Sequence, residues 1–407
     1  MLHFKKSLVL ACMFLLSIHG ISSAQQVNVG DIITPANVDQ YTDYLPPFVV
    51  QFIKDGFGVV SPDVTSPIYV GDVHTPLAPE SFRKESEKNS GKVTLNPEDM
   101  KLTGFEYCGI PFPDVEEPNK VEKILCNYYY RWRSDDYYYK EPFATTSKRK
   151  GGRITCYNTT SALVRYVGRT APGLETNLDN PNDLFWVQMN RFLQPSFKNL
   201  RTLQWRYLDP KKDDDMWSYI PTLRRTLRMV SSERANPING TPLTYDDFMG
   251  FDGKLNKFTY KLSEEKKVIG NINMDAQAHI RRYPDLRYES PLFHGPEYPY
   301  GIADVYIIDV IPKDPTYPES KKVLYMNKLN YMNVYSIVYD KRGQPWKGLV
   351  NNVSETKTVQ GEKGYFNAQM DFDMKTGYWM NIFTNGVTQD SGLPSSLFDP
   401  GIFHTWQ

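Results

Sequence analysis

The sequence predicts a mainly β protein with a few helices (α+β), built around one large antiparallel sheet. From Arg153 onward, short apolar or alternating segments follow one another, separated by turn sequences such as DPKKDDD, DKRGQP and MKTG. Aromatic residues make up 14% of the chain and include 28 tyrosines, a composition typical of wide amphipathic strands. Parallel strands need long crossover connections, so strands joined by such short turns indicate antiparallel pairing rather than βαβ units.

The first 24 residues have the character of a secretory signal peptide. Two lysines, the second of them Lys6, precede the apolar run LVLACMFLLSI, and small residues at Ser22 and Ala24 precede a cleavage point at Gln25. The run is shorter than the about 20 apolar residues of a retained membrane helix. Cys12 could instead mark a lipoprotein cleavage site, but only five residues separate it from Lys6. We expect residues 1–24 to be removed and the mature chain to be exported without an attached lipid.

The composition of the mature chain excludes several classes of protein. Loss of the signal peptide leaves 45 basic and 47 acidic residues, a net charge of −2, which argues against nucleic acid as a partner because phosphate binding needs a concentrated basic face. Cys108, Cys126 and Cys156 remain, so at most one disulfide can form within the chain, and any two of the three could form it. There is no CxxC pair and no zinc-ligand spacing.

The elements before the sheet are predicted from Pro and Gly content and from helical periodicity. Residues 25–113 have few long periodic runs and are expected to form an irregular arm with one short helix in DQYTDYLPPFVVQFI. A clearer helix is predicted over 116–132, with Pro118 in its first turn. Its apolar stripe comprises Val121, Ile124, Leu125, Tyr128 and Trp132. Such a stripe packs on a sheet in most domains, and here it could also cover a concave one.

The remaining segments predict the strands of the sheet in order. They are RITCYNTTSALVRYVG, LFWVQMNRFL, LRTLQWRYLD, the hairpin described below, FTYKL, VYIIDVIP, KKVLYMN, NVYSIVYD, PWKGLVNN and NAQMDFDMKTGYWMNIF. TYDDF interrupts them as a short helix, because Thr244 is a good N-cap and an aspartate follows three residues later.

The hairpin sequence DMWSYIPTLRRTLRM (215–229) places arginines among large apolar residues. Trp217 and Tyr219 are two apart and so share one face of a strand. After Pro221, the series Leu223, Arg225, Leu227, Met229 alternates with Arg224, Thr226, Arg228. One face of this hairpin is therefore a candidate ligand-binding surface.

Sequence signatures of catalysis and of metal binding are missing. There is no GxSxG, HExxH or Walker loop, and His74, His279, His294 and His404 are scattered without ligand spacing. The triplet Asp213-Asp214-Asp215 is interpreted as a solvated turn rather than a metal site. Asp371 and Asp373 share a strand face as paired carboxylates would, but alternating polar residues of an edge strand explain them equally well. We expect no enzymatic activity, no catalytic residue, no cofactor and no metal.

Five segments, in one order along the chain, resemble the exported Gram-negative proteins of domain-of-unknown-function family 1329. They are VGDIITPANVDQYTDYL, GIPFPDVEEPNKVEKILCNYYYRWR, DMWSYIPTLRRTLRM, TPLTYDDFMGF and YDKRGQPWKG. The family's motifs correspond here to Pro35-Ala36-Asn37, Pro111-Phe112-Pro113, and Trp217 to Pro221 with the arginines that follow. The resemblance covers essentially the whole mature chain. Cys126-Asn127 departs from it, where an aromatic residue is expected before the asparagine.

The hairpin is also similar to that of outer-membrane lipoprotein-sorting factors, the LolA/LolB-like group. This resemblance implies a curved antiparallel half-barrel, with helices on the concave face around an apolar cavity that takes acyl chains. It also implies one domain over 25–407, with 25–113 packed on it as an arm, and a periplasmic location close to the outer membrane. Possible partners are a lipid-exporting transporter or an outer-membrane protein.

On this architecture we predict which residues would bind a ligand. Trp217, Tyr219, Leu227 and Met229 are expected to face the concavity with Arg225 among them, and the helix is expected to contribute Val121, Leu125 and Tyr128. Arg225 could hold a carboxylate or phosphate head, or it could pair with a neighbouring acid of the sheet. The leading hypothesis is non-enzymatic binding or transfer of a lipid, lipoprotein or other hydrophobic molecule. The alternative is a carbohydrate-active or envelope-polymer protein that uses an open aromatic groove.

Overall fold

A computed structural model describes residues 26–55, 67–139, 142–148, 155–193, 198–274, 298–384 and 386–406. The predicted signal peptide, Cys12, His279 and His294 lie outside these residues. Within them, no helix combines the length and the apolar character needed to cross a bilayer.

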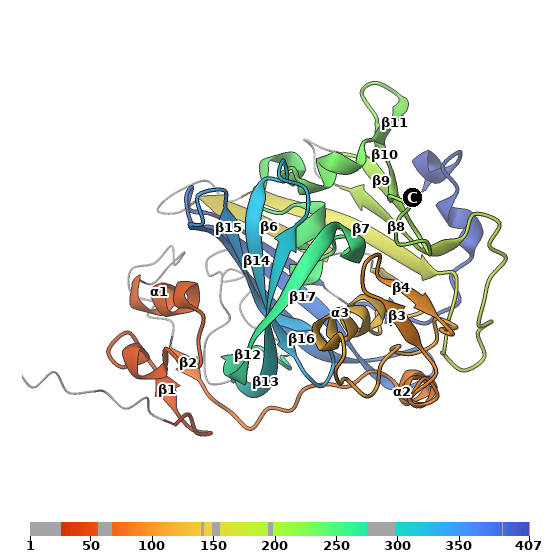
Figure 1. Ribbon diagram of the computed structural model, residues 1–407. Coiled ribbons are helices and arrows are strands. Elements are labelled where there is room, and N and C mark those ends of the chain that lie inside the picture. The colour runs from red at the N-terminus through yellow and green to blue at the C-terminus, as the bar shows by residue number, and fades with distance from the viewer. Residues whose placement is uncertain are drawn as a thin grey trace, which may run out of the picture.

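One large antiparallel sheet dominates the fold, as the sequence predicts (Figure 1). Its main path runs β11-β10-β9-β8-β7-β6-β18-β17-β16-β15-β14-β13-β12, and β5 and β19 pair with each other beside β7. In chain order the strands are β5 (Asp136–Tyr139), β6 (Pro142–Lys148), β7 (Thr155–Arg165), β8 (Leu184–Phe192), β9 (Arg201–Tyr207), β10 (Asp215–Ile220), β11 (Arg225–Met229), β12 (Phe258–Gly270), β13 (Gly301–Pro312), β14 (Glu319–Asn327), β15 (Asn333–Asp340), β16 (Pro345–Lys357), β17 (Lys363–Asp373), β18 (Tyr378–Thr384) and β19 (Thr388–Gln389). We call β7–β11 the short wing and β12–β18 the long wing. The two wings meet at β6.

The predicted central helix is α3 (Lys120–Tyr130), and it lies in the concavity between the wings. Its buried residues share one hydrophobic cluster with Leu163 and Trp186 of the short wing and with Ile308 and Leu324 of the long wing. The helix starts four residues later than predicted, because Asn119 adopts a left-handed conformation with φ of 64°. Pro118 therefore precedes the helix instead of occupying its first turn. We call the sheet face toward α3 the inner face.

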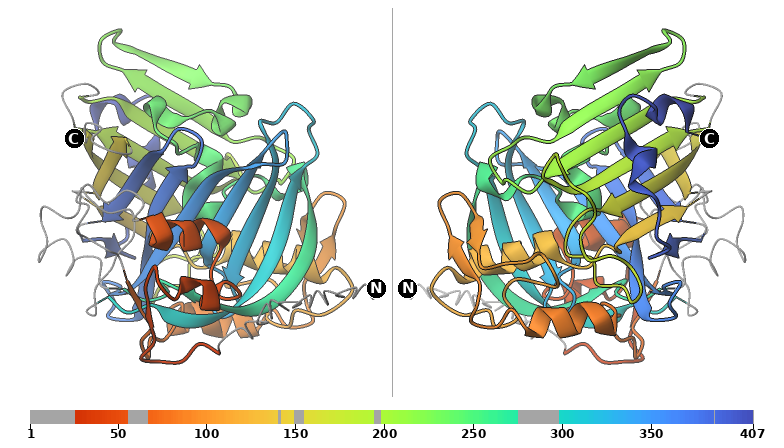
Figure 2. Two further views of the ribbon diagram at one scale, coloured as in Figure 1. Left: turned by 90° about the vertical axis from the view of Figure 1, so that its left-hand side faces the viewer. Right: turned by 90° about the vertical axis from the view of Figure 1, so that its right-hand side faces the viewer.

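The N-terminal arm covers the outer face of the long wing. It contains β1 (Ile32–Ile33), η1 (Val38–Tyr41), α1 (Pro47–Asp55) and β2 (Ile68–Tyr69), and Figures 1 and 2 show α1 and α3 on opposite faces of the sheet. The Phe52 ring packs edge-on against Phe372, with 4.9 Å between centroids. Gly348 makes room for Phe48, because a Cβ there would lie 2.6 Å from the ring. Helices thus cover both faces of the sheet.

The segment between α1 and α3 is more regular than predicted. It contains α2 (Glu80–Glu87) and a small hairpin of β3 (Thr94–Asn96) and β4 (Lys101–Thr103). These elements are short, and α2 buries only Phe82 and Ser86, so their sequences carry little periodic signal.

Short 3-10 helices complete the inner face and cover the outer face of the short wing. They are η3 (Ser231–Ala235), η4 (Ile238–Gly240), η5 (Tyr245–Gly250), η6 (Leu255–Lys257), η8 (Ser395–Phe398) and η9 (Phe403–Thr405). The predicted TYDDF helix is η5, and Asp247 accepts hydrogen bonds from the backbone N–H and the hydroxyl of Thr244. Cys108 and Cys126 are free thiols, and the side chain of Cys156 lies outside the described part of the chain.

Candidate binding site on the inner face of the sheet

The predicted hairpin forms from β10 and β11, but its register divides the predicted residues between two faces. Ser218 lies opposite Leu227, and Tyr219 lies opposite Thr226. Directly paired residues of an antiparallel ladder project to the same face. Met229 and Arg225 therefore share the face of Leu227, with Ser218.

The prediction that Trp217 and Tyr219 face the concavity with these residues is wrong. Both project from the outer face of the short wing, because the four-residue turn 221–224 sets a register in which Ile220 pairs with Arg225. Trp217 packs edge-on against Trp205 at 5.2 Å between centroids, and the Tyr219 ring lies 5.6 Å from the His404 ring. The C-terminal segment covers this face, and Trp205 Nε1 donates to the carbonyl of Phe398 at 3.2 Å.

The predicted residues of α3 belong to the packed core. Leu125 is 0% exposed and Tyr128 is 1% exposed, whereas Val121 is partly buried beside them. The Tyr128 hydroxyl donates to the carbonyl of Phe251, and the Arg131 guanidinium lies 4.0 Å from the centre of the Tyr128 ring. The predicted role of these three residues as ligand contacts remains a prediction.

An apolar groove lies on the inner face between the short wing, β18 and the η4–η5 segment. Its first part, about 70 Å³, is lined by Tyr139, Thr159, Asn190, Phe192, Thr202, Ile238, Thr241, Leu243, Tyr245, Phe248, Met380 and Ile382. Its second part, about 220 Å³, shares Phe192, Thr202, Ile238 and Tyr245 and continues to Ser218 and Met229 of the hairpin. This part is also lined by Leu200, Glu233, Asn236 and Pro237. We call the two parts together the inner groove. It joins β18 to the inner face of the hairpin.

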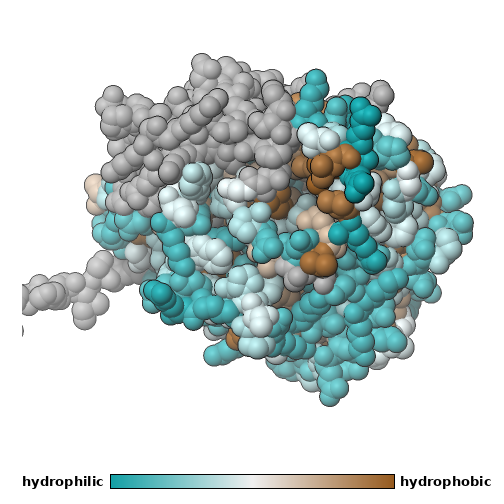
Figure 3. Space-filling model, turned by 90° about the horizontal axis from the view of Figure 1, so that it is seen from above, coloured by the Kyte–Doolittle hydropathy of each residue, from teal (hydrophilic) through white to brown (hydrophobic). Residues whose placement is uncertain are grey.

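The inner groove has one apolar side and one weakly polar side. Leu243 and Met380 form a small hydrophobic cluster with Ile238, Phe248 and Ile382 around them. On the opposite side, Asn190 Nδ2 donates to the Thr202 hydroxyl at 3.2 Å. Figure 3 shows apolar residues on the upper face of the molecule, with polar residues beside them. No charged residue lines the first part of the groove.

A buried ion network lies on the inner side of the sheet. The Asp214 carboxylate is fully buried and accepts from Arg206 at 2.8 Å and from Arg234 at 3.2 Å. Arg234 also donates to Asp246 of η5 at 2.7 Å. The Lys254 ammonium lies 3.6 Å from Asp214. These contacts tie β9 and the loop before β10 to η3, η5 and η6.

The interpretation of Asp213-Asp214-Asp215 as a solvated turn is therefore wrong for Asp214. Its neighbour Asp213 remains half-exposed and pairs with Lys257. Asp215 also reaches the surface, where it pairs with Arg228 of β11. A run of acids cannot itself reveal that one member points inward toward two arginines.

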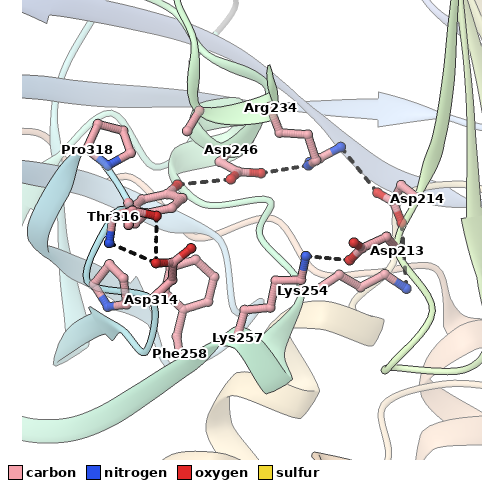
Figure 4. Close-up of a pocket in the computed structure, with 13 residues that line it drawn as sticks. Asp213, Asp214, Arg234, Asp246, Lys254, Lys257, Phe258, Asp314, Thr316 and Pro318 are labelled. Carbon is pink, nitrogen blue, oxygen red and sulfur yellow. Dashed lines mark hydrogen bonds and ion pairs between the residues drawn. The ribbon is translucent and has the colours of Figure 1, made fainter. Parts of the chain in front are cut away.

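A polar pocket of about 210 Å³ opens beside this network (Figure 4). It lies between the loop before β10 and the turn that joins β13 to β14, and Asp213, Lys257, Asp314 and Thr316 line its rim. The Tyr317 hydroxyl donates to Asp246 at 2.9 Å. This bond extends the Asp214 network to the long wing.

A second buried network surrounds Asp247. Its two carboxylate oxygens accept from Lys322 and Lys347, each at 2.7 Å. The Gln369 amide donates to the Asp247 carbonyl at 2.9 Å and to Asp371 at 2.8 Å. Asp371 is 0% exposed and lies opposite Met380 of the inner groove.

The sequence interpretation of Asp371 and Asp373 as alternating polar residues of an edge strand is wrong. Strand β17 is internal, between β16 and β18. Asp371 is buried, and Asp373 accepts from the indole N–H of Trp346 at 3.1 Å. The two acids do not act as a pair, because each has its own partner.

The two networks shift several pKa values in opposite directions. Burial alone would raise the pKa of Asp214, but the charges of Arg206 and Arg234 lower it below the usual range. By contrast, burial raises the pKa of Asp371 well above its usual range, and the nearby Asp247 charge adds to that rise. Burial also lowers the pKa of Lys254 to about 8.

The described residues contain no group of three or more His, Cys, Asp or Glu side chains arranged to hold a metal ion. The acids of both networks instead have arginine, lysine or amide partners. His74 is exposed at the surface, near Asp72.

The profile of the family described as "Protein of unknown function (DUF1329)" matches residues 32–397. The chain belongs to this family. No curated protein matches the chain.

Solved structures similar to this DUF1329 chain include a DUF1329 family protein from Desulfovibrio piger. It is 17% identical, with a TM-score of 0.46, and the match covers 66% of this chain and 91% of that one. A putative outer membrane lipoprotein-sorting protein domain from Vibrio parahaemolyticus is 15% identical, with a TM-score of 0.49 and coverage of 69% and 97%. A LolA superfamily protein from Nitrosomonas europaea is 12% identical, with a TM-score of 0.41 and coverage of 67% and 93%. Likenesses this distant say nothing about the ligand of the DUF1329 chain.

Sequence reasoning missed the buried networks of the DUF1329 chain. A signal was present at Arg206 and Lys347, because each interrupts a strand segment whose neighbours are apolar. A cation at such a position needs a buried acid. The sequence could not say which acid, since Asp247 of η5 lies 100 residues from Lys347 and nothing in the run 213–215 singles out Asp214.

Proposed function

We propose that this DUF1329 protein binds a lipid or another molecule with an acyl chain in the inner groove and carries it without chemical change. The observation that carries the proposal is the apolar side of the groove, formed by Leu243 and Met380 with Ile238, Phe248 and Ile382. Transfer of an acyl chain from water to such a surface is favourable by about 0.8 kcal/mol for each buried CH₂.

The dimensions of the inner groove restrict the occupant. Its parts, about 70 and 220 Å³, are smaller than the roughly 300–1,000 Å³ of small-molecule sites. A single acyl chain, or part of one, fits these volumes better than a whole lipid molecule does. The head of such a lipid would remain outside, near the hairpin.

Arg225 is a candidate partner for an anionic head. It is exposed and shares the inner face with Leu227, and it has no ion-pair partner among the described residues. The alternative hypothesis, an ion pair between Arg225 and a neighbouring acid of the sheet, has no support among the described residues. A carboxylate or phosphate head would make a charge-assisted, bidentate contact with this guanidinium.

A carrier role without catalysis is supported by the state of the charged groups near the groove. Asp214 and Asp247 are bound by buried arginines and lysines, and Asp371 is held by an amide. These three carboxyl groups therefore have their partners within the fold.

The proposal includes the setting expected from the sequence. The mature chain, 25–407, would form one domain with 25–113 as an arm on it, and it would be located in the periplasm, where it could associate with the outer membrane. A lipid-exporting transporter or an outer-membrane protein would exchange cargo with it.

Native mass spectrometry of protein purified from the periplasm tests the proposal. We expect the wild type to carry an adduct with the mass of a lipid. Ile238→Glu should lose the adduct, because an unpaired carboxylate in an apolar groove costs several kcal/mol. Ile238 is only partly buried, so the variant should still fold.

Ile402→Glu is the matched control, because Ile402 is 49% exposed in the C-terminal segment that covers the outer face. It should keep the adduct. Wild-type protein without lipid, or Ile238→Glu with its full adduct, would refute the proposal. A glycan adduct would support the carbohydrate alternative instead.

A further inference from the structure

The segment 223–230, which comprises the last two turn residues of the β10–β11 hairpin, strand β11 and Val230, carries exposed apolar side chains. We call it the hairpin tip. Leu223, Leu227 and Val230 are 57%, 45% and 61% exposed. Figures 1 and 2 show the hairpin extending away from the body of the sheet. Leu223 and Leu227 lie toward the turn, whereas Val230 follows Met229 at the base of the hairpin. Large aliphatic side chains left in water at the projecting end indicate a surface that meets something apolar.

The hairpin tip is also strongly basic in a chain that is otherwise balanced. Its sequence, LRRTLRMV, contains three arginines and no acid. Arg228 pairs with Asp215, whereas Arg224 and Arg225 have no ion-pair partner among the described residues. Arg224 occupies the turn itself with φ of 50°.

We propose that the hairpin tip docks on the surface of an anionic lipid bilayer. Aliphatic side chains mixed with unpaired arginines suit the headgroup region, where the apolar groups enter the boundary and the guanidinium groups meet lipid phosphates. A surface that bound an apolar protein alone would not need the arginines, and one that bound a soluble anion would not need the exposed leucines.

This inference rests on the proposed function and adds the partner surface to it. The inner groove ends at Ser218 and Met229 of the same hairpin, so docking brings the mouth of the groove to the bilayer. An acyl chain could then pass between membrane and groove over a short path. Leu227 lies on that path, on the inner face.

A second copy of the chain is the competing occupant, because β11 is the edge strand of the sheet. Antiparallel pairing of two β11 strands would bring arginines from both copies together. Like charges opposite one another disfavour such a pair. The bilayer has the complementary charge.

Flotation with lipid vesicles tests docking on the full mature protein. We expect binding to vesicles of phosphatidylglycerol and phosphatidylcholine in equal parts, and little binding to phosphatidylcholine alone. Arg224→Gln/Arg225→Gln should weaken binding about 30-fold, because each basic residue near an anionic surface contributes about fivefold. Leu223→Ser/Leu227→Ser should remove the part of the binding that resists high salt.

The control is Lys341→Gln/Arg342→Gln, an exposed basic pair in the turn between β15 and β16. It removes the same charge and should leave vesicle binding unchanged. Thermal melts establish that each variant is folded. Equal binding to both kinds of vesicle, or equal losses in tip and control variants, would overturn the proposal.

Light scattering measures the oligomeric state and so tests whether a second copy of the chain, rather than a bilayer, binds the hairpin tip. A dimer that the tip variants abolish would assign the hairpin tip to self-association and overturn bilayer docking. Native mass spectrometry of the wild type, beside its vesicle flotation, separates this inference from the proposed function. A cargo-loaded wild type that does not bind vesicles refutes docking alone, whereas a wild type without cargo refutes the carrier.

Discussion

Buried charges are the main residue-scale feature of this protein. Asp214 is fully buried between Arg206 and Arg234, and Asp247 is fully buried between Lys322 and Lys347. Removal of one member of such a network leaves an opposite charge buried without compensation. The consecutive aspartates 213 and 214 therefore differ sharply in their expected contribution to stability.

Asp214→Asn is expected to lower the free energy of unfolding by about 3–5 kcal/mol, because it leaves Arg206 and Arg234 without their shared carboxylate. Asp213→Asn removes only a half-exposed partner of Lys257 and should cost less than about 1 kcal/mol. Urea unfolding of the two variants beside the wild type measures the difference. Equal losses would contradict the network described here.

At the scale of elements, the register of one hairpin decides which residues face the inner groove. Trp217 and Tyr219 anchor the C-terminal segment on the outer face, while Leu227 and Met229 lie beside the inner groove. A shift of one residue would exchange these roles. Substitutions on the outer face of the hairpin should therefore change stability, and substitutions on its inner face should change cargo binding.

Trp217→Ala is expected to lower the free energy of unfolding by about 2–3 kcal/mol, since it removes a partly buried ring packed on Trp205. Leu227→Glu should change stability by less than about 0.5 kcal/mol, because Leu227 is 45% exposed, yet it should abolish cargo retention. Thermal melts beside mass-spectrometric cargo analysis measure both effects. A Leu227→Glu variant that unfolds, or one that keeps its cargo, would remove Leu227 from the site.

At the scale of the whole molecule, buried carboxyl groups hold distant parts together. Asp390, which follows β19, accepts from the backbone N–H of Asp135 at 2.6 Å. Burial, the Asp135 charge and other nearby charges raise the pKa of Asp390 to about 8, and burial raises the pKa of Glu319 in the Asp247 network to about 7. Both acids bind protons more tightly in the folded chain than in the unfolded one.

The free energy of unfolding should therefore fall as pH rises from about 5 to 8. An acid with a raised pKa favours folding below its unfolded pKa, and this advantage is lost as pH rises toward the folded pKa. The slope should approach about 1.4 kcal/mol per pH unit for each group protonated only in the folded state. Asp214 and Asp247, whose pKa values are lowered, act only at lower pH.

Urea unfolding at a series of pH values measures this slope. Asp390→Asn keeps an oxygen that can accept from Asp135 and removes the titration, so it should flatten the dependence and stabilise the protein at pH 8. An unchanged slope in this variant would show that Asp390 is not a source of the pH dependence.

The sequence by itself determined the elements that depend on local pattern. The strand segments from 155 onward, the α3 stripe and the Thr244–Asp247 cap could be predicted, because alternation, helical periodicity and capping are written in neighbouring residues. Five ordered motifs also indicated the family. The α2 helix and the β3–β4 hairpin were missed, since they are too short to show a periodic pattern of apolar residues.

Only the tertiary structure decided which face of the sheet each residue occupies and which charges meet. The register of β10 with β11 depends on the conformation of a four-residue turn, and one step in it moves Trp217 to the opposite face. Lys322 and Lys347, the partners of Asp247, come from strands 75 and 100 residues away in the chain. Contacts of this kind exist only when the sheet curves and brings its two wings together, which no local pattern encodes.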